Sequence, residues 1–267
     1  MDELQRDLAP ISSAAWAEID AMAKRVLRVN LAARKLVDFN GPRGWEKASV
    51  KVGRVDPLPA PLKGVEGKLR RVQPLVELRS DFELARAELD NVARGARDPD
   101  LEPLIEAATR LARAEDGAIF HGYKAAGIRG IIDNSPHKPL PISEDYQAYP
   151  GLVAEAERIL RQSGVDGPFA IALGPRCYAG LMQATRGGYP LFELIRRILD
   201  GPVVWAPAVD GAVVLSMEGG DFQLTVGSDI SIGYASHDVE KVRLYFVESL
   251  TFQVFTPEAA VALSYSS

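Results

Sequence analysis

The chain has 267 residues, of which 47% are hydrophobic and 25% are charged, so it holds enough apolar side chains to fold around a substantial core. Its net charge of -5 argues against nucleic-acid binding as a main task, and no apolar run approaches the roughly 20 residues that a membrane-spanning helix needs. The first seven residues, MDELQRD, are too charged for a secretion signal, so we expect a cytoplasmic protein.

The first predicted element is a helix that begins at Ser12 or Ser13, either of which can cap free backbone amides. Apolar residues at spacings of three and four then mark one helical face: Ile19, Met22, Val26, Val29, Ala33 and Leu36. A second strip widens this face: Trp16, Leu27 and Leu31. We expect the helix to end at Gly41-Pro42, and its wide apolar arc to contact both the core and a neighbour or ligand.

Residues 46–73 are predicted to form a projecting hairpin or arm. Basic residues and prolines recur along this stretch, and Val50, Val52 and Val55 alternate as in short strands. Such a segment can hardly bury a core of its own. Residues 1–71 hold 14 Lys and Arg against 9 Asp and Glu, and the remainder holds 17 against 27. A basic front and an acidic back could complement each other between copies, although the same pattern also serves plain solubility.

The middle of the chain predicts a strand over 75–79, a short helix near 84–92 and a long helix from about Leu101 to Ala126. Asp98-Pro99-Asp100 provides the start of the long helix, whose length of roughly 40 Å would make it the spine of a domain. Glu115 lies on the apolar stripe of this helix, so it must find a partner if it is buried.

The second half of the chain predicts a loop followed by short alternating elements. After the loop at 133–150, we expect helices and strands in this order: helix 152–162, strand 169–173, helices 175–184 and 191–199, then strands 203–205, 212–217, 222–226 and 242–255. This mixture predicts the α+β class. A break in composition near Asp133 is the best domain boundary, and we expect a return to the first domain near Ser228.

No catalytic motif is present in the sequence. It lacks a Gly-x-Ser-x-Gly elbow, a phosphate loop and a His-Glu-x-x-His pair, and its three histidines, at 121, 137 and 237, are far apart. His121 is expected to be packed or capping, and the other two to be solvated. The single cysteine, Cys177, is expected to be buried and inert. We therefore predict no catalytic residue, no metal and no cofactor.

Short blocks of sequence stand out along nearly the whole chain, and in chain order they include RDLAP at 6–10, PLVELR at 74–79, ELDNVARG at 88–95, IFHG at 119–122, GYP at 188–190 and DISIGY at 229–234. These blocks resemble those of the family-one encapsulins, whose fold is that of HK97-type phage capsid proteins. No single block is decisive, but their combination and order are specific. The resemblance implies an HK97 capsid-like fold with a peripheral domain, an axial domain and an extended loop.

The resemblance also implies how the chain divides. Residues 1–48 would carry the inner-face helix of the peripheral domain, and 49–73 would be the extended loop that lies on a neighbouring subunit. Residues 74–133 and 226–267 would form the peripheral domain, and 134–225 the axial domain around the fivefold vertices.

The function that the resemblance implies is a non-enzymatic bacterial shell. Copies of the chain would form an icosahedral particle of 60 subunits or a multiple. The particle would enclose dye-decolourising peroxidases or ferritin-like, iron-handling proteins through their C-terminal targeting tails. Some relatives stack a flavin on a tryptophan, but Ala87 stands at that position here, so no flavin is assigned. The alternatives are the major capsid protein of an HK97-type phage or prophage and, as a third class, a hydrolase.

Two sites are predicted within this framework. A groove for the cargo tail would be bordered by Leu27, Leu31, Arg34, Asp38 and Ile230, unless the leucines simply pack in the core. A loop lining the fivefold pore would consist of Thr185, Arg186, Gly187 and Gly188, with Arg186 forming a positive ring. The alternative for this loop is an ordinary turn between helices whose arginine points elsewhere.

Overall fold

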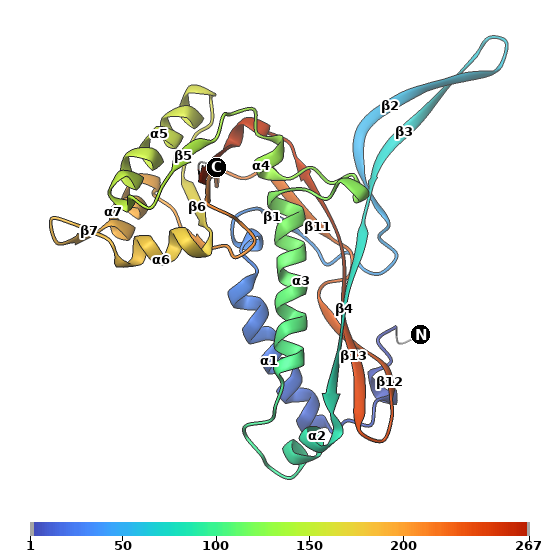
Figure 1. The fold of residues 1–267 in the computed structure, drawn as a ribbon. Coiled ribbons are helices and arrows are strands. Elements are labelled where there is room, and N and C mark those ends of the chain that lie inside the picture. The colour runs from blue at the N-terminus through green and yellow to red at the C-terminus, as the bar shows by residue number, and fades with distance from the viewer. Residues whose placement is uncertain (1–2, 266–267) are drawn as a thin grey trace.

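The computed structural model describes residues 3–265. Two short stretches lie outside the described residues: residues 1–2, at the charged start of the chain, and residues 266–267, at the end of the last predicted segment. The described chain contains two five-stranded sheets with helices packed on them, and a long two-stranded hairpin projects from this body (Figure 1). This mixture confirms the α+β class. Within the described range, no helix is both long and apolar enough to cross a membrane.

The first sheet is built around β13 (Lys241–Val254), a long strand that pairs antiparallel with three others. These partners are β4 (Val76–Ala85), β11 (Phe222–Val226) and β12 (Ser231–His237). The short strand β1 (Asp38–Asn40) adds to β11 in parallel. The inward side chains of β13 alternate with exposed ones near Lys241, as expected for a sheet with one solvated face.

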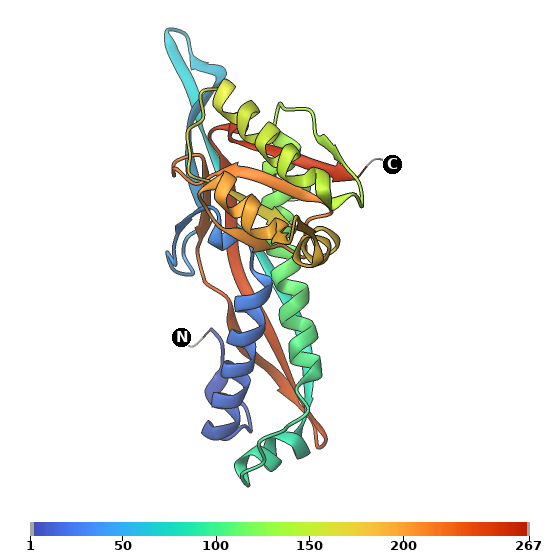
Figure 2. The same cartoon turned by 90° about the vertical axis from the view of Figure 1, so that its left-hand side faces the viewer.

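Three helices cover the first sheet: α1 (Ser13–Asn30), α2 (Arg86–Ala93) and α3 (Glu102–Phe120). Figure 2 shows α1 and α3 running side by side, and their contact buries Ile19, Leu104 and Ala108 completely. The Ser12 hydroxyl accepts a hydrogen bond from the Ala15 amide at 3.2 Å, which confirms the predicted cap.

The first helix ends at Asn30, so the prediction that it continues to Gly41-Pro42 is wrong. The reason lies 84 residues away, where the carboxylate of Asp116 accepts the backbone amides of Ala32 and Ala33 at 2.8 and 3.0 Å. These amides donate to a side chain, and the chain after Leu31 turns away from the helix axis.

The spine helix is also shorter than predicted, because it ends at Phe120 instead of Ala126. Its 19 residues span about 28 Å. Gly122 follows in a left-handed conformation with φ 87°, and a Cβ on it would lie 2.8 Å from the amide nitrogen of Gly130. The close approach of these two glycines folds the chain back on itself and ends the helix.

The second sheet has the order β5-β14-β10-β6-β9. Its strands are β5 (Leu140–Ile142), β6 (Phe169–Leu173), β9 (Val203–Trp205), β10 (Ala212–Ser216) and β14 (Ala260–Tyr265), and its helices are α5 (Tyr149–Gln162), α6 (Pro175–Gln183) and α7 (Leu191–Leu199). Every residue of β6 and β10 is buried. The strand predicted at 169–173 and the two helices that follow it are confirmed.

The division of strands between the sheets differs from the expected segments in two places. Residues 222–225 of β11 fall in the predicted axial segment 134–225, yet β11 pairs with β13 in the first sheet. β14 was assigned with residues 226–267, yet it pairs with β10 and β5 in the second sheet. Residues 260–263 are apolar on both faces, which suits a strand between two others and not an edge.

The projecting hairpin consists of β2 (Ser49–Leu62) and β3 (Val65–Pro74). We call it the arm, defined as residues 49–74. Nearly all of its residues are exposed, and it extends far from both sheets (Figure 1). At its base the amide of Gln73 donates to the Thr251 hydroxyl and the Phe252 carbonyl, which fastens the arm to the first sheet. The predicted hairpin is confirmed, with longer strands than its prolines suggested.

Candidate functional site

Four of the five residues predicted to border a groove line one depression of about 480 Å³: Leu27, Leu31, Arg34 and Ile230. The depression lies between α1 and the beginning of β12, and we call it the α1 groove. Its apolar floor includes Ile232 and Phe246, which sequence reasoning did not single out. α1 can serve both surfaces because Ile19 is fully buried in the core, while Ala23 and Leu27, one and two turns farther along the helix, line the groove.

The two leucines are not equally available to a ligand. Leu31 is 8% exposed and therefore packs mainly into the protein, whereas Leu27 and Ile230 are half-buried. Basic side chains stand around the depression, including Lys24 and Arg28. A ligand with apolar side chains would thus contact Leu27 and Ile230 most directly.

Asp38 does not lie in the α1 groove, so its placement there is wrong. It belongs to β1, and its carboxylate accepts the Gly220 amide at 2.6 Å in a smaller depression. A helix continuing past Arg34 would have kept Asp38 on the same face, but the chain leaves the helix at Asn30. Asp229, in the DISIGY block whose Ile230 was predicted, lines the groove instead, together with Asp20 of α1.

Arg34 joins the α1 groove to the buried core. Its guanidinium donates two hydrogen bonds to Glu115, through Nε at 2.8 Å and Nη2 at 2.6 Å. It also donates to Asp229 at 2.7 Å and to Glu248 at 3.2 Å. The side chains of Glu115 and Glu248 are fully buried. Glu115 therefore has the partner that its position on the apolar stripe requires.

Three carboxylates around one guanidinium cannot all be balanced by it. Burial, together with the neighbouring charge of Glu115, raises the pKa of Glu248 well above its ordinary value. One Glu248 oxygen, Oε1, is buried without a hydrogen-bond partner among residues 3–265. Nearby, burial raises the pKa of Asp116 to about 7, although its two backbone hydrogen bonds oppose this shift.

These buried acids predict that the protein becomes less stable as the pH rises. Asp116 holds its proton more tightly in the folded chain than in the unfolded chain, so its stabilisation is complete below pH 4 and lost through about pH 7. Asp116 contributes up to about 4 kcal/mol to the free energy of unfolding at low pH, because each unit of its raised pKa corresponds to about 1.4 kcal/mol. Thermal unfolding should therefore occur at a lower temperature at pH 8 than at pH 5. Asp116→Asn should flatten this dependence, and a midpoint that rises with pH would contradict it.

The predicted pore loop forms the tip of a small hairpin between α6 and α7. β7 (Thr185–Arg186) pairs with β8 (Tyr189–Pro190), and the two glycines between them have φ values of 58° and 82°. Such left-handed backbone at two successive positions favours glycine. Arg186 is exposed, and Figure 1 shows β7 at the outer edge of the second sheet's helices. The Thr185 carbonyl accepts the Gln147 side-chain amide at 2.8 Å.

The histidines and the cysteine do not come together. Each histidine ring has its own partner: the Ala208 carbonyl for His121, the Glu258 carbonyl for His137 and the Tyr234 hydroxyl for His237. Cys177 is buried, with its sulfur 3.3 and 3.2 Å from two tyrosine hydroxyls, those of Tyr149 and Tyr265. Over residues 3–265, no group of three His, Cys, Asp or Glu could hold a metal ion.

Comparison with known proteins adds independent findings. The family model described as "Encapsulating protein for peroxidase" matches residues 1–251. The "Type 1 encapsulin shell protein" of Rhodospirillum rubrum is 51% identical over 270 residues, covering 98% of this chain and 96% of the relative.

Solved structures show the fold. The match to the virus-like particle of Pyrococcus furiosus covers 93% of this chain and 98% of the matched chain, with a TM-score of 0.66 and 17% identity. The match to the capsid of Myoviridae phage XM1 covers 88% of this chain and 91% of the matched chain, with a TM-score of 0.52 and 12% identity. These likenesses confirm the HK97 capsid-like fold.

Proposed function

This chain belongs to the type 1 encapsulin shell proteins, and we propose that its copies close into an icosahedral particle of 60 subunits or a multiple. We further propose that the particle lies in the cytoplasm, has no catalytic activity of its own and encloses enzymes by their C-terminal tails. A peroxidase is the cargo that the family description favours, and a ferritin-like protein is the alternative. The high identity to a shell protein argues against a phage capsid protein or a hydrolase.

The arm is the observation that carries the assembly proposal. Sixteen large hydrophobic side chains are exposed within residues 3–265, and seven of them lie on the arm: Val52, Val55, Leu58, Leu62, Val65, Leu69 and Val72. Apolar surface gathered on a projecting element is typical of an interaction site. A neighbouring copy that covered the arm would remove this surface from water and stabilise the assembly.

Size and shape test the assembly proposal. Sixty copies of the 29.0 kDa chain would have a mass of about 1.7 MDa. Light scattering after size-exclusion chromatography should give this mass or a multiple, and electron microscopy should show closed particles. A stable monomer or small dimer would overturn the proposal.

The α1 groove is our proposed binding site for the cargo tail. An extended peptide could place apolar side chains against Leu27 and Ile230, while the charges of Arg34 and Asp229 would orient its polar groups. Support comes from the gathering of these residues at one depression and from the mainly apolar character of its floor. Apolar contacts would supply most of the affinity.

Leu27→Asp should empty the shell of cargo while leaving assembly intact. A carboxylate there would oppose burial of an apolar tail side chain, and we expect cargo occupancy to fall at least roughly tenfold. Val29→Asp is the matched control, because Val29 lies on the same helix, is 57% exposed and does not line the groove. Cargo per shell, measured by gel densitometry of purified particles, checks this. Normal occupancy in the Leu27→Asp shells would exclude the α1 groove.

The hairpin tip at 185–188 is our proposed lining of the fivefold pore. Five copies of Arg186 would form a positive ring that favours anions over cations. Arg186→Glu should reverse the charge preference for uptake of small solutes into loaded shells, and salt should weaken the effect. Stopped-flow uptake of matched anionic and cationic dyes measures this. Unchanged selectivity at low salt would remove Arg186 from the pore.

A further inference from the structure

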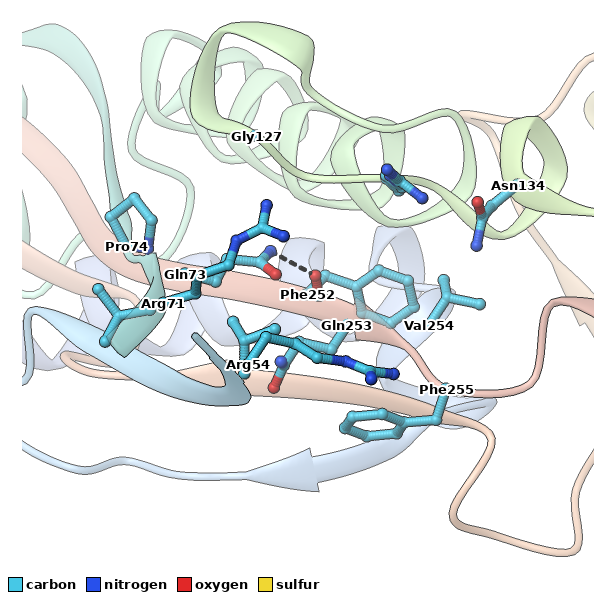
Figure 3. Close-up of a pocket in the computed structure, with 13 residues that line it drawn as sticks. Arg54, Arg71, Gln73, Pro74, Gly127, Asn134, Phe252, Gln253, Val254 and Phe255 are labelled. Atoms are coloured by element: carbon cyan, nitrogen blue, oxygen red, sulfur yellow. Dashed lines mark hydrogen bonds between the residues drawn. The ribbon is translucent and has the colours of Figure 1, made fainter. Parts of the chain in front are cut away.

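The root of the arm carries a pocket of about 610 Å³ whose lining is basic and apolar (Figure 3). The pocket lies where the first residues of β2 and the last residues of β3 meet the end of β13 and the segment 127–134. We propose that it receives the turn between β12 and β13 of a second copy, residues 238–240. This contact rests on the proposed assembly and adds a specific pair of surfaces to it.

The pocket has positive charge that the chain itself does not balance. Arg54, Arg71 and Arg129 line it, and no acidic residue of the described chain does. Arg71 lies 3.5 Å from Asp56, but Arg54 and Arg129 have no ion pair or side-chain hydrogen bond within the described chain. Figure 3 shows Arg54 and Arg71 extending along the pocket from the arm. The pocket therefore suits a carboxylate from outside the subunit.

Apolar side chains stand exposed beside these arginines. Phe255 and Val72 are each 54% exposed, and Val52 is 38% exposed. An occupant that only neutralised the arginines would leave this surface in water. The pocket thus fits a segment with both an acidic and an aliphatic side chain, which a small inorganic anion does not offer.

The turn at 238–240 has this complementary chemistry. Val239 is 87% exposed, more than any other large hydrophobic residue described in the chain. Glu240 beside it makes no side-chain hydrogen bond or ion pair within residues 3–265. The turn is also preformed, because the Asp238 carboxylate accepts the amides of Glu240 and Lys241, both at 2.8 Å. A rigid turn loses little entropy on binding.

The two surfaces cannot meet within one subunit. The turn precedes Lys241 at one end of β13, and the pocket surrounds Val254 at the other end. Fourteen residues of strand separate them by about 45 Å, and Figure 1 shows β13 running between these ends. A contact between them must therefore join the head of one copy to the tail of the next. Contacts of this kind build rings when the rotation between copies closes.

Charge reversal tests the contact from both sides. Arg54→Glu with Arg129→Glu should reduce the yield of closed shells at least roughly tenfold, because Glu240 would face like charges. Glu240→Arg alone should have the same effect against the native arginines. Combining all three changes should restore shells to within about twofold of the native yield. Particle yield by size-exclusion chromatography and electron microscopy gives the readout, and circular dichroism confirms that each subunit is folded.

The control is Arg113→Glu with Lys138→Glu, which changes the charge equally at exposed positions outside the pocket and should leave assembly normal. Normal shells from the Arg54→Glu/Arg129→Glu variant would overturn the proposed contact. Binding of pyrophosphate to native shells would then mean that a free anion, and not the turn, fills the pocket. Failure of the triple variant to assemble would exclude the turn as the occupant. Absence of shells from the native chain would instead sink the assembly proposal itself.

Discussion

Replacing Arg34 with methionine should lower the free energy of unfolding by roughly 3–5 kcal/mol. The change removes the only cation that contacts Glu115 and Glu248 in the described structure, and the Glu115 carboxylate is left buried without its two hydrogen bonds. Removing one partner of a buried pair costs more than the pair contributes, because the remaining charge has no access to water. The midpoint of thermal unfolding should fall by about 10 °C.

The matched control is Arg6→Met, which breaks an ion pair at the same groove. The Arg6 and Asp20 side chains are 29% and 49% exposed, so this loss should cost less than about 1 kcal/mol. Adding Glu115→Gln to Arg34→Met should recover about half of the lost stability, since the unpaired charge disappears. Differential scanning fluorimetry on shells and on unassembled subunits makes these comparisons. Equal losses for Arg34→Met and Arg6→Met would contradict this account of the cluster.

Deleting residues 49–71 should abolish closed shells and leave the remaining body folded. The ends of the deleted segment lie close together, because Ser49 pairs with Pro74 and the Leu75 amide donates to the Ala48 carbonyl at 2.9 Å. Closing the gap therefore requires little rearrangement. The arm contributes no residue to either buried core of the described chain, so its loss should remove only the proposed contacts between copies and leave the core of the subunit intact.

Two measurements distinguish the outcomes of this deletion. Light scattering should change from a particle of megadalton mass to a species of one or a few subunits. Circular dichroism should retain the helix and strand content of the body. Closed shells of native stability from the deletion variant would mean that the arm is not needed for assembly. An unfolded variant would show that the arm stabilises the subunit itself, which also contradicts the prediction.

Local signals in the sequence predicted the elements that depend on local chemistry. Ser12 caps α1 because its hydroxyl can reach an amide three residues on, and the apolar run 169–173 forms a strand buried on both faces. The end of α1 could not be predicted in this way, since it depends on Asp116, far along the chain. The same error placed Asp38 in the groove. In a continued helix, Asp38 would lie on the same face as Arg34, four residues earlier, but in strand β1 it lies at a different depression.

The pairing of distant strands was likewise hidden from the sequence. β14 has an apolar pattern that fits either sheet, and only its neighbours β10 and β5 decide where it lies. For the α1 groove, four of the five residues predicted to border it lie together at one depression. Three of these lie on or just after α1, and the fourth belongs to a block noted through the family resemblance. The pocket at the arm root was not foreseen, because it combines three segments that are far apart in sequence.

The position of Cys177 has a practical consequence for labelling. It is the only cysteine in the chain, and it is fully buried beside the hydroxyls of Tyr149 and Tyr265. Maleimides and similar reagents react with exposed thiolates, so the Cys177 thiol should not react with them in the folded subunit. A cysteine introduced at Arg186, which is exposed, would then be the single reactive site per subunit. A fluorophore or spin label could thus be attached at one defined position without first removing a native cysteine.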